Sequence, residues 1–303
     1  MRFTWLLLAT ASCAPPAVAA TPAAAVSSAF WDHWGDGQAE LASYRLTRQR
    51  YKQARKGTTV LVFVTETFTD AQRVKSDGGH PDEYPVLKVN RADDYQTGIY
   101  DYNVMTSTFV RIDGTAPIGQ PVKVSMSMQE WCGHVYEQLI TGSGALDWTS
   151  HSYFDGEADR RQDLPLPEDG LLLDALPILV RGLVGDLVPA GGSRTLPALR
   201  TLASRRTQHA PPKWTEVTIA RSDELTDVTV PAGTFSVRTI TTTVGNQTTE
   251  WSVEAAPPHR LIRWANGTRE VAELLGVDRQ PYWQKNREGD EALLERIGLS
   301  PPQ

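Results

Sequence analysis

Alternating apolar and polar residues dominate the chain from about residue 39 onward. The clearest case places apolar side chains at positions 122, 124, 126 and 128, with polar side chains between them. This period-two pattern predicts a strand with one buried face and one face in water. The apolar run from Val60 to Val64 predicts a fully buried strand. Further strands are expected near 40–51, 85–90, 97–110, 134–140, 146–154, 214–220, 225–230, 234–243, 249–254, 260–265 and 269–275.

Helical patterns are few. The segment 171–183 has helical spacing, but Pro177 and Gly182 predict that this helix is short or kinked. Residues 290–299 predict a terminal helix that is N-capped by Asp290 and stops at Gly298. The expected fold is therefore mainly β (α+β): a large twisted antiparallel sheet or incomplete β-barrel with one or two short helices.

The first residues have the composition of an export signal. Met1-Arg2 is followed by a short apolar stretch and then by small residues up to Ala20. We expect a signal peptide at 1–20, a linker at 21–28 and a single β-rich domain at 29–303, with a helical insertion near 170–185. Small residues before Cys13 leave lipidation of that cysteine as an alternative to cleavage near Ala20.

Composition narrows the class of protein. The 303 residues include 30 Lys and Arg against 36 Asp and Glu, for a net charge of −6. This balance argues against nucleic acid as a partner. The long apolar stretch is confined to the N-terminus, so no transmembrane span is expected in the mature chain. We expect an exported protein, in the periplasm or associated with the outer membrane of a Gram-negative-type bacterium, with a lipid anchor if Cys13 is modified.

Several segments carry a resemblance to known families. The hairpin VPAGTF at 230–235, followed by WSVE at 251–254 and LIRW at 261–264, resembles the sheet of envelope proteins with a lipoprotein-carrier-like open barrel. A second set of segments resembles an uncharacterised secreted bacterial family whose members are sometimes labelled septum formation inhibitor Maf: GDGQAEL (35–41), VLVFVTE (60–66), TGIYDYNVM (97–105), SMQEWCGH (127–134), HSYFDGEAD (151–159) and ERIGL (295–299). True Maf nucleotide pyrophosphatases are cytoplasmic α/β proteins with a basic Ser-Arg-Arg segment near the N-terminus. This chain has the signal-like segment there instead, so that label is misleading, and the resemblance implies no activity.

The first candidate site is Glu130, Cys132 and His134. If the strand that begins near 122 continues without a bulge, these three side chains share its buried face. They could then bind a metal or form a nucleophile and base pair. The favoured interpretation is a hydrogen-bonded strand end where a bulge at Gly133 turns His134 to solvent. We expect Cys132, the one cysteine of the mature chain, to be buried, unmodified and non-catalytic.

The second candidate site contains His151, Tyr153, Asp155 and Glu157. The spacing of the carboxylates resembles half a calcium loop, but Arg160 stands where an EF-hand needs glycine. A loop whose carboxylates bond backbone amides or Arg160 and Arg161 is the favoured interpretation. Pairing about the turn at 141–145 would place residue 134 opposite roughly 152, so a metal-assisted hydrolase combining both candidate sites is an alternative function.

The third candidate site is Trp31, His33 and Trp34, which could line the mouth of a pocket. An aromatic cluster that packs the start of the domain is favoured, because tryptophan mostly serves to bury area.

The sequence lacks the motifs of several well-known catalytic and cofactor-binding families. It contains no GxSxG, Walker A, GxGxxG after a strand or HExxH. We therefore expect no cofactor, no resident metal and no catalytic residue. The favoured function is a non-catalytic envelope protein that binds or carries an amphipathic or lipid-like small molecule in a concave sheet. A structural envelope protein with no ligand is the second alternative, and it would have a filled sheet interior.

Overall fold

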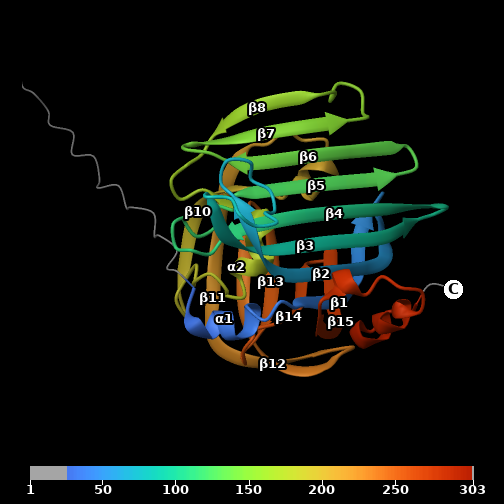
Figure 1. Ribbon diagram of the computed structural model, residues 1–303. Coiled ribbons are helices and arrows are strands. Elements are labelled where there is room, and N and C mark those ends of the chain that lie inside the picture. Colours follow the sequence, from blue (N-terminus) through green and yellow to red (C-terminus); the bar gives the residue numbers. More distant parts are fainter. Residues whose placement is uncertain (1–25, 302–303) are drawn as a thin grey trace, which may run out of the picture.

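A computed structural model describes residues 26–301. The segment 1–20 expected as a signal peptide, most of the expected linker at 21–28, and Cys13 lie outside the described residues. Fifteen strands form one sheet in the order β8-β7-β6-β5-β4-β3-β2-β1-β15-β14-β13-β12-β11-β10-β9. The expected large, mainly antiparallel sheet with a few short helices is confirmed (Figure 1).

The strands fall into two runs along the chain. The first run is β1 (Ala39–Arg50), β2 (Gln53–Thr69), β3 (Glu83–Thr97), β4 (Tyr100–Arg111), β5 (Lys123–Glu130), β6 (Gly133–Thr141), β7 (Ala145–Ser152) and β8 (Arg160–Pro165). The second run is β9 (Leu171–Leu172), β10 (Ser193–Leu199), β11 (Trp214–Val230), β12 (Gly233–Val244), β13 (Gln247–Glu254), β14 (Leu261–Asn266) and β15 (Glu270–Gln280). The helices are α1 (Ser28–Trp34), η1 (Leu173–Ala175), α2 (Leu176–Leu179), α3 (Leu202–Arg206), η2 (Tyr282–Gln284) and η3 (Asp290–Ile297).

The two runs join in the middle of the sheet, where the first strand of the chain, β1, pairs with the last, β15. Antiparallel pairing of β1 with β15 sets Arg45 opposite Glu273 and Arg48 opposite Glu270. The two edges of the sheet, β8 and β9, are consecutive in sequence and are linked by residues 166–170. The meander therefore curls around a concave face and leaves an open barrel, because its edge strands do not complete the ladder.

Strand pairing brings some backbones very close together. Gly57 of β2 pairs with Tyr95 of β3, and a Cβ on Gly57 would lie 2.6 Å from the Cβ of Tyr95. Glycine is therefore required for this close approach at the concave face.

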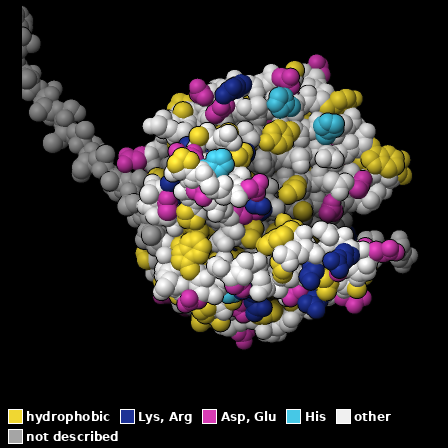
Figure 2. All heavy atoms as spheres, viewed as in Figure 1, with side chains coloured by type: hydrophobic (Ala, Val, Ile, Leu, Met, Phe, Trp, Pro, Cys, Tyr) yellow, Lys and Arg dark blue, Asp and Glu magenta, His cyan; other side chains and the backbone are white. Residues whose placement is uncertain are grey.

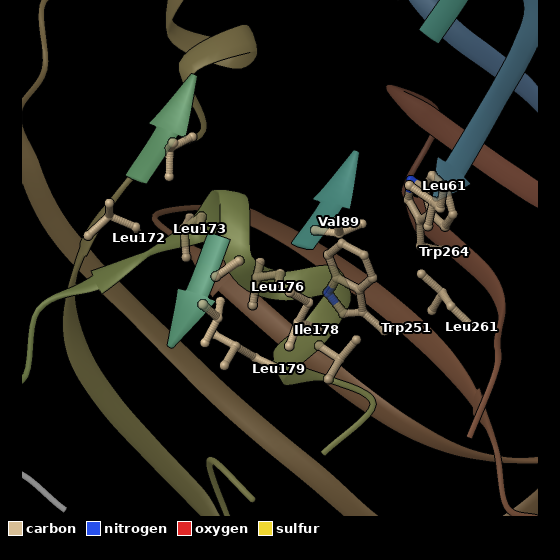
Figure 3. Close-up of a cluster of buried hydrophobic side chains, with 14 of the residues drawn as sticks. Leu61, Val89, Leu172, Leu173, Leu176, Ile178, Leu179, Trp251, Leu261 and Trp264 are labelled. Carbon is tan, nitrogen blue, oxygen red and sulfur yellow. The ribbon is translucent and has the colours of Figure 1, made fainter. Parts of the chain in front are cut away.

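A helical segment made of η1 and α2, called the interior segment below, fills part of the concave side of the sheet. Ile178 of α2 is fully buried, and Leu176 and Leu179 are nearly so. They belong to the same buried cluster as Val89 on β3 and Trp251 on β13 (Figure 3). In the region near 170–185, where a helical insertion was expected, the chain forms a short helical segment on the concave side of the sheet.

Buried ion pairs tie elements that are distant in sequence across the interior. Arg181, which follows α2, donates to Glu40 of β1 at 2.7 and 3.1 Å, and also to the carbonyl oxygens of Pro258 and His259. Arg205 of α3 pairs with Glu137 of β6, whose carboxylate also accepts from the indole of Trp148. These pairs hold the interior segment and α3 against the sheet. Separating the two partners of a pair would leave a buried charge without compensation, which is costly in free energy.

Several sequence expectations are corrected in detail. The segments 214–220 and 225–230 form one strand, β11, with a register shift between Arg221 and Leu225. The terminal helix η3 is of the 3₁₀ type and is capped by Gly289, not by Asp290. Gly298 ends it in the left-handed region, with φ of 75°. The strands β8, β9 and β10 and the helices α1 and α3 were not predicted.

Candidate functional site

The candidate cluster of Glu130, Cys132 and His134 does not form on one buried strand face, and His134 faces solvent as the favoured interpretation predicted. Glu130 ends β5 and Gly133 begins β6, so Trp131 and Cys132 form the turn of a hairpin. Cys132 is exposed, which makes the expectation of a buried thiol wrong. Two-residue hairpins reverse the chain at their tip, and that tip lies outside the core. The strand with the alternating pattern ends at Glu130, so Cys132 lies beyond its last residue and is not on its buried face.

The environment of Cys132 nevertheless opposes reactivity. Its backbone N–H donates to Glu130 Oε2 at 2.9 Å. A hydrogen bond with Glu130 and the negative charge of this carboxylate raise the pKa of the Cys132 thiol. A raised pKa leaves less thiolate at neutral pH, and the thiolate is the reactive form.

The two candidate histidines lie on the solvent side of neighbouring strands. Tyr136 pairs with His151 and Val135 with Ser152, so the expected pairing of β6 and β7 is confirmed with a register one residue away from the predicted one. His134 and His151 are exposed, and His151 contacts Asp159 at 3.0 Å. Residues 26–301 contain no group of three or more His, Cys, Asp and Glu side chains placed to hold a metal ion.

Glu157 is the member of the second candidate site that makes long-range contacts. It pairs with Arg206 and with His209 Nδ1, the latter at 2.7 Å, and accepts from Ser152 at 3.0 Å. Burial alone would raise its pKa, but His209, Ser152 and Arg206 hold the pKa of Glu157 below its ordinary value. Glu157 therefore fastens the loop after β7 to helix α3, and it does not bond Arg160 or Arg161 as expected.

The other side chains of that loop face solvent. Asp155 and Tyr153 are exposed. The ring of Tyr153 covers Gly133, where an added Cβ would lie 2.5 Å from it. This contact joins the tip of the β5–β6 hairpin to the end of β7.

The aromatic residues of α1 pack the start of the domain. Trp34 is buried against Phe63, while Trp31 is 40% exposed. Burial and the charge of Arg279 lower the pKa of His33. None of these α1 residues is among those that line the cavity described next.

A cavity of about 430 Å³ lies between the concave face and the interior segment. Its apolar wall is formed by Val89, Val104, Leu173, Leu176, Pro177, Val244, Trp251 and Trp264. Its volume falls within the range of small-molecule sites, about 300–1,000 Å³. The surface is hollowed on the side where the hairpins β3–β4 and β5–β6 end (Figure 2).

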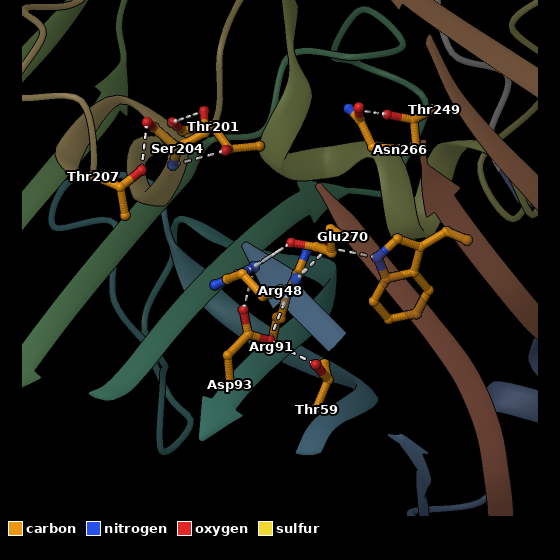
Figure 4. Close-up of polar contacts among 11 residues, drawn as sticks. Arg48, Thr59, Arg91, Asp93, Thr201, Ser204, Thr207, Thr249, Asn266 and Glu270 are labelled. Carbon is orange, nitrogen blue, oxygen red and sulfur yellow. Dashed lines mark hydrogen bonds and ion pairs between the residues drawn. The ribbon is translucent and has the colours of Figure 1, made fainter. Parts of the chain in front are cut away.

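A four-residue charge network forms one part of the cavity lining (Figure 4). Arg48 of β1 and Arg91 of β3 each contact both Asp93 and Glu270. Arg91 lies 2.8 Å from Asp93 and 2.7 Å from Glu270. Thr59 donates to Asp93 and the indole of Trp264 donates to Glu270.

The network is electrostatically balanced within the sheet. Burial would raise the pKa of Glu270, but the charges of Arg48 and Arg91 hold it well below the ordinary value. These groups were missed at the level of sequence. Arg91, Asp93 and Tyr95 follow Val89 at every second position. This period-two spacing indicates that the strand extends past residue 90, with these side chains on the same inward face as Val89.

Polar side chains from α3 and from β13–β14 form further parts of the lining. Thr201 caps α3 through the N–H of Ser204, and Thr207 donates to the carbonyl oxygen of Ser204. Asn266 donates to Thr249. The cavity thus combines an apolar wall with hydroxyl, amide and charged groups.

Asp174 of η1 is a second carboxyl group of the cavity lining whose pKa is shifted, in the direction opposite to that of Glu270. It accepts hydrogen bonds from the backbone N–H of Leu202 at 3.2 and 3.3 Å. Burial raises the pKa of Asp174 to about 7, against the opposing effects of the Leu202 hydrogen bond and the charge of Arg205. A carboxyl group that titrates near neutral pH therefore faces the cavity.

No helix among the described residues is both long and apolar enough to cross a membrane. No family model matches the sequence, and no curated protein matches it significantly. Among solved structures, the chain is similar to a β-barrel-like protein of the domain family of unknown function DUF1849 from Brucella abortus. The identity is 11%, the TM-score is 0.46, and the match covers 79% of this chain and 97% of that one.

A second similar structure is a protein from Bacteroides fragilis that is described as exported and has a YmcC-like fold. Its identity is 13% and its TM-score 0.21, with 79% of this chain and 95% of that chain covered. The resemblance to a secreted family therefore stays an expectation from sequence segments. The cavity and its side chains are the basis on which a function can be assigned.

Proposed function

We propose that this protein is a non-catalytic cell-envelope protein that binds an amphipathic small molecule inside its curved sheet. The observation that carries the proposal is the cavity of about 430 Å³, which the interior segment leaves open against the concave face. Its lining combines apolar side chains, such as Leu176 and Trp251, with polar and charged ones, such as Thr201 and Arg48. Such a lining suits a ligand with one apolar and one polar end. The export signal expected at 1–20 supports the envelope location.

The two alternative functions have less support. A metal-assisted hydrolase would need His134 and His151 to converge on one ion, whereas both are exposed on the outer face of the sheet. A purely structural protein would have a filled interior, whereas the cavity remains beside the helical segment.

Ligand binding can be tested with a variant that fills the cavity. Ala203 of α3 lines the cavity, so Ala203→Trp should block uptake of a fluorescent fatty acid. Ala292→Trp is the matched control, because Ala292 is an exposed residue of η3 outside the cavity lining.

Two measurements would decide the question. Native mass spectrometry of the protein from the envelope fraction should show a bound small molecule in wild type and in Ala292→Trp, and its loss in Ala203→Trp. Equal fatty-acid uptake by a folded Ala203→Trp variant would contradict binding in this cavity. A clean unliganded mass, together with no uptake by wild type, would contradict the proposed function as a whole.

A further inference from the structure

Cations outnumber anions in the cavity lining. Five arginines contribute to it, against three acidic residues; they are Arg48, Arg50, Arg91, Arg200 and Arg269, and Asp93, Asp174 and Glu270. Two of the arginines and two of the acids belong to the balanced network described above. The excess positive charge therefore resides on the other three arginines.

Arg50 is held in place by neutral groups. Its guanidinium donates to the carbonyl oxygen of Thr207 at 3.2 Å and to the hydroxyls of Tyr102 and Tyr51 at 2.9 and 3.4 Å. Its Nε is buried without a hydrogen-bond partner among the described residues. A partly buried guanidinium that is oriented only by neutral acceptors keeps its full charge available for an anion.

Arg200 and Arg269 reach the cavity from two different elements. Arg200 lies between β10 and α3, and Arg269 precedes β15 beside Gln49 of β1. Neither forms an ion pair with any residue in the range 26–301. Arginines without carboxylate partners around a concave site are the side chains that bind carboxylate or phosphate oxygens.

Asp174 does not cancel this excess. Its carboxyl group accepts from the backbone N–H of Leu202, and the cation that acts on it, Arg205, is already paired with Glu137. Burial also favours its neutral form near neutral pH.

On the basis of the proposed function, we propose that the cavity selects amphiphiles whose polar end is an anionic carboxylate or phosphate group, bound by Arg50, Arg200 and Arg269. The apolar end of such a molecule lies against Trp251 and Trp264. Charge selection is then a property of this cavity in addition to its affinity for apolar chains.

The test uses four probes with the same twelve-carbon chain and different polar ends: dodecanoate, dodecyl phosphate, 1-dodecanol and dodecyltrimethylammonium. Binding to the full folded chain is measured by calorimetry and by the change in intrinsic tryptophan fluorescence. The two anions should bind at least about tenfold more tightly than the alcohol or the cation, as expected for charge-assisted hydrogen bonds. Whichever anion binds more tightly identifies the group as carboxylate or phosphate, and either result supports the proposal.

Matched variants separate the charge from the cavity. Arg200→Gln and Arg269→Gln should each weaken dodecanoate or dodecyl phosphate binding by about tenfold and leave 1-dodecanol binding unchanged. Arg287→Gln removes the same charge from an exposed residue outside the cavity lining and should change neither. Thermal unfolding confirms that each variant is folded.

The outcomes distinguish the two proposals. Equal binding of 1-dodecanol and the anions, or anion binding that survives both arginine substitutions, would overturn the charge selection while the proposed function stands. Failure of all four probes to bind wild type would overturn the proposed function itself.

Discussion

Replacing Asp174 by Asn should change the way stability depends on pH. Asp174 has a pKa of about 7 in the folded protein because it is buried, against an ordinary value of 3.8. The folded state therefore holds a proton between about pH 4 and pH 7 that the unfolded chain releases. The free energy of unfolding contributed by this group consequently falls as pH rises through that window, and levels off above pH 7.

The size of the effect follows from the shift. Each pKa unit corresponds to about 1.4 kcal/mol, so a shift of roughly three units gives about 4 kcal/mol at most. Asn resembles the protonated carboxyl, stays neutral at every pH, and can still accept from the N–H of Leu202 through Oδ1. Asp174→Asn should therefore match wild type near pH 4 and exceed its stability by up to about 4 kcal/mol at pH 8.

Urea unfolding of both proteins at intervals from pH 4 to pH 8.5 measures this difference. Contributions from other titrating groups, such as Glu270, cancel when the two curves are subtracted. Asp163→Asn is the control, because Asp163 is an exposed residue of β8, and its difference from wild type should stay near zero. A flat difference for Asp174→Asn, or a variant less stable than wild type at pH 8, would refute the reasoning.

Three further predictions concern the core and the hairpin tip. Arg181→Met should lower the free energy of unfolding by about 3–5 kcal/mol, because it leaves Glu40 buried and unpaired. In urea unfolding, adding Glu40→Gln should recover much of this loss, and a double variant no more stable than the single one would contradict the reasoning. Cys132 in the native protein should react with a maleimide as completely as in a urea-unfolded control, because the residue is exposed. Its reaction should be slower than that of the unfolded chain at neutral pH, because the raised pKa leaves less thiolate; protection from labelling in the native state would show that the tip is covered. Ile178→Ala should cost about 2–5 kcal/mol in thermal or urea unfolding, whereas Ile99→Ala at an exposed turn should cost almost nothing; similar losses for both would mean that the interior helix contributes little to stability.

Strand content and alternation were legible in the sequence because side chains on a strand point to opposite faces in turn. Val124, Met126 and Met128 are buried as the pattern predicts. The hairpin at Gly233 and the pairing of β6 with β7 follow from short-range turn signals in the same way. In these two hairpins local sequence was sufficient, because the paired strands are joined by a short turn.

The position of Cys132 shows where this reasoning fails. A strand pattern predicts which face a residue occupies, but it does not predict the residue at which the chain reverses. Glu130 pairs with Gly133, so the turn removes Cys132 from the strand altogether. Whether the thiol is buried or exposed therefore depends on a single strand pair, Glu130 with Gly133, at the end of the hairpin.

The cavity itself was decided by tertiary structure. Arg48 and Glu270 are 222 residues apart in sequence, and the pairing of β1 with β15 makes them neighbours. Arg200 comes from the second run of strands, and it lines the cavity because the sheet curls around the interior segment. Each strand by itself determined that an inward-facing arginine or carboxylate was present. Curvature and long-range pairing determined which charges neutralise one another and which remain free to bind a ligand, because electrostatic balance depends on distances that only the folded chain sets.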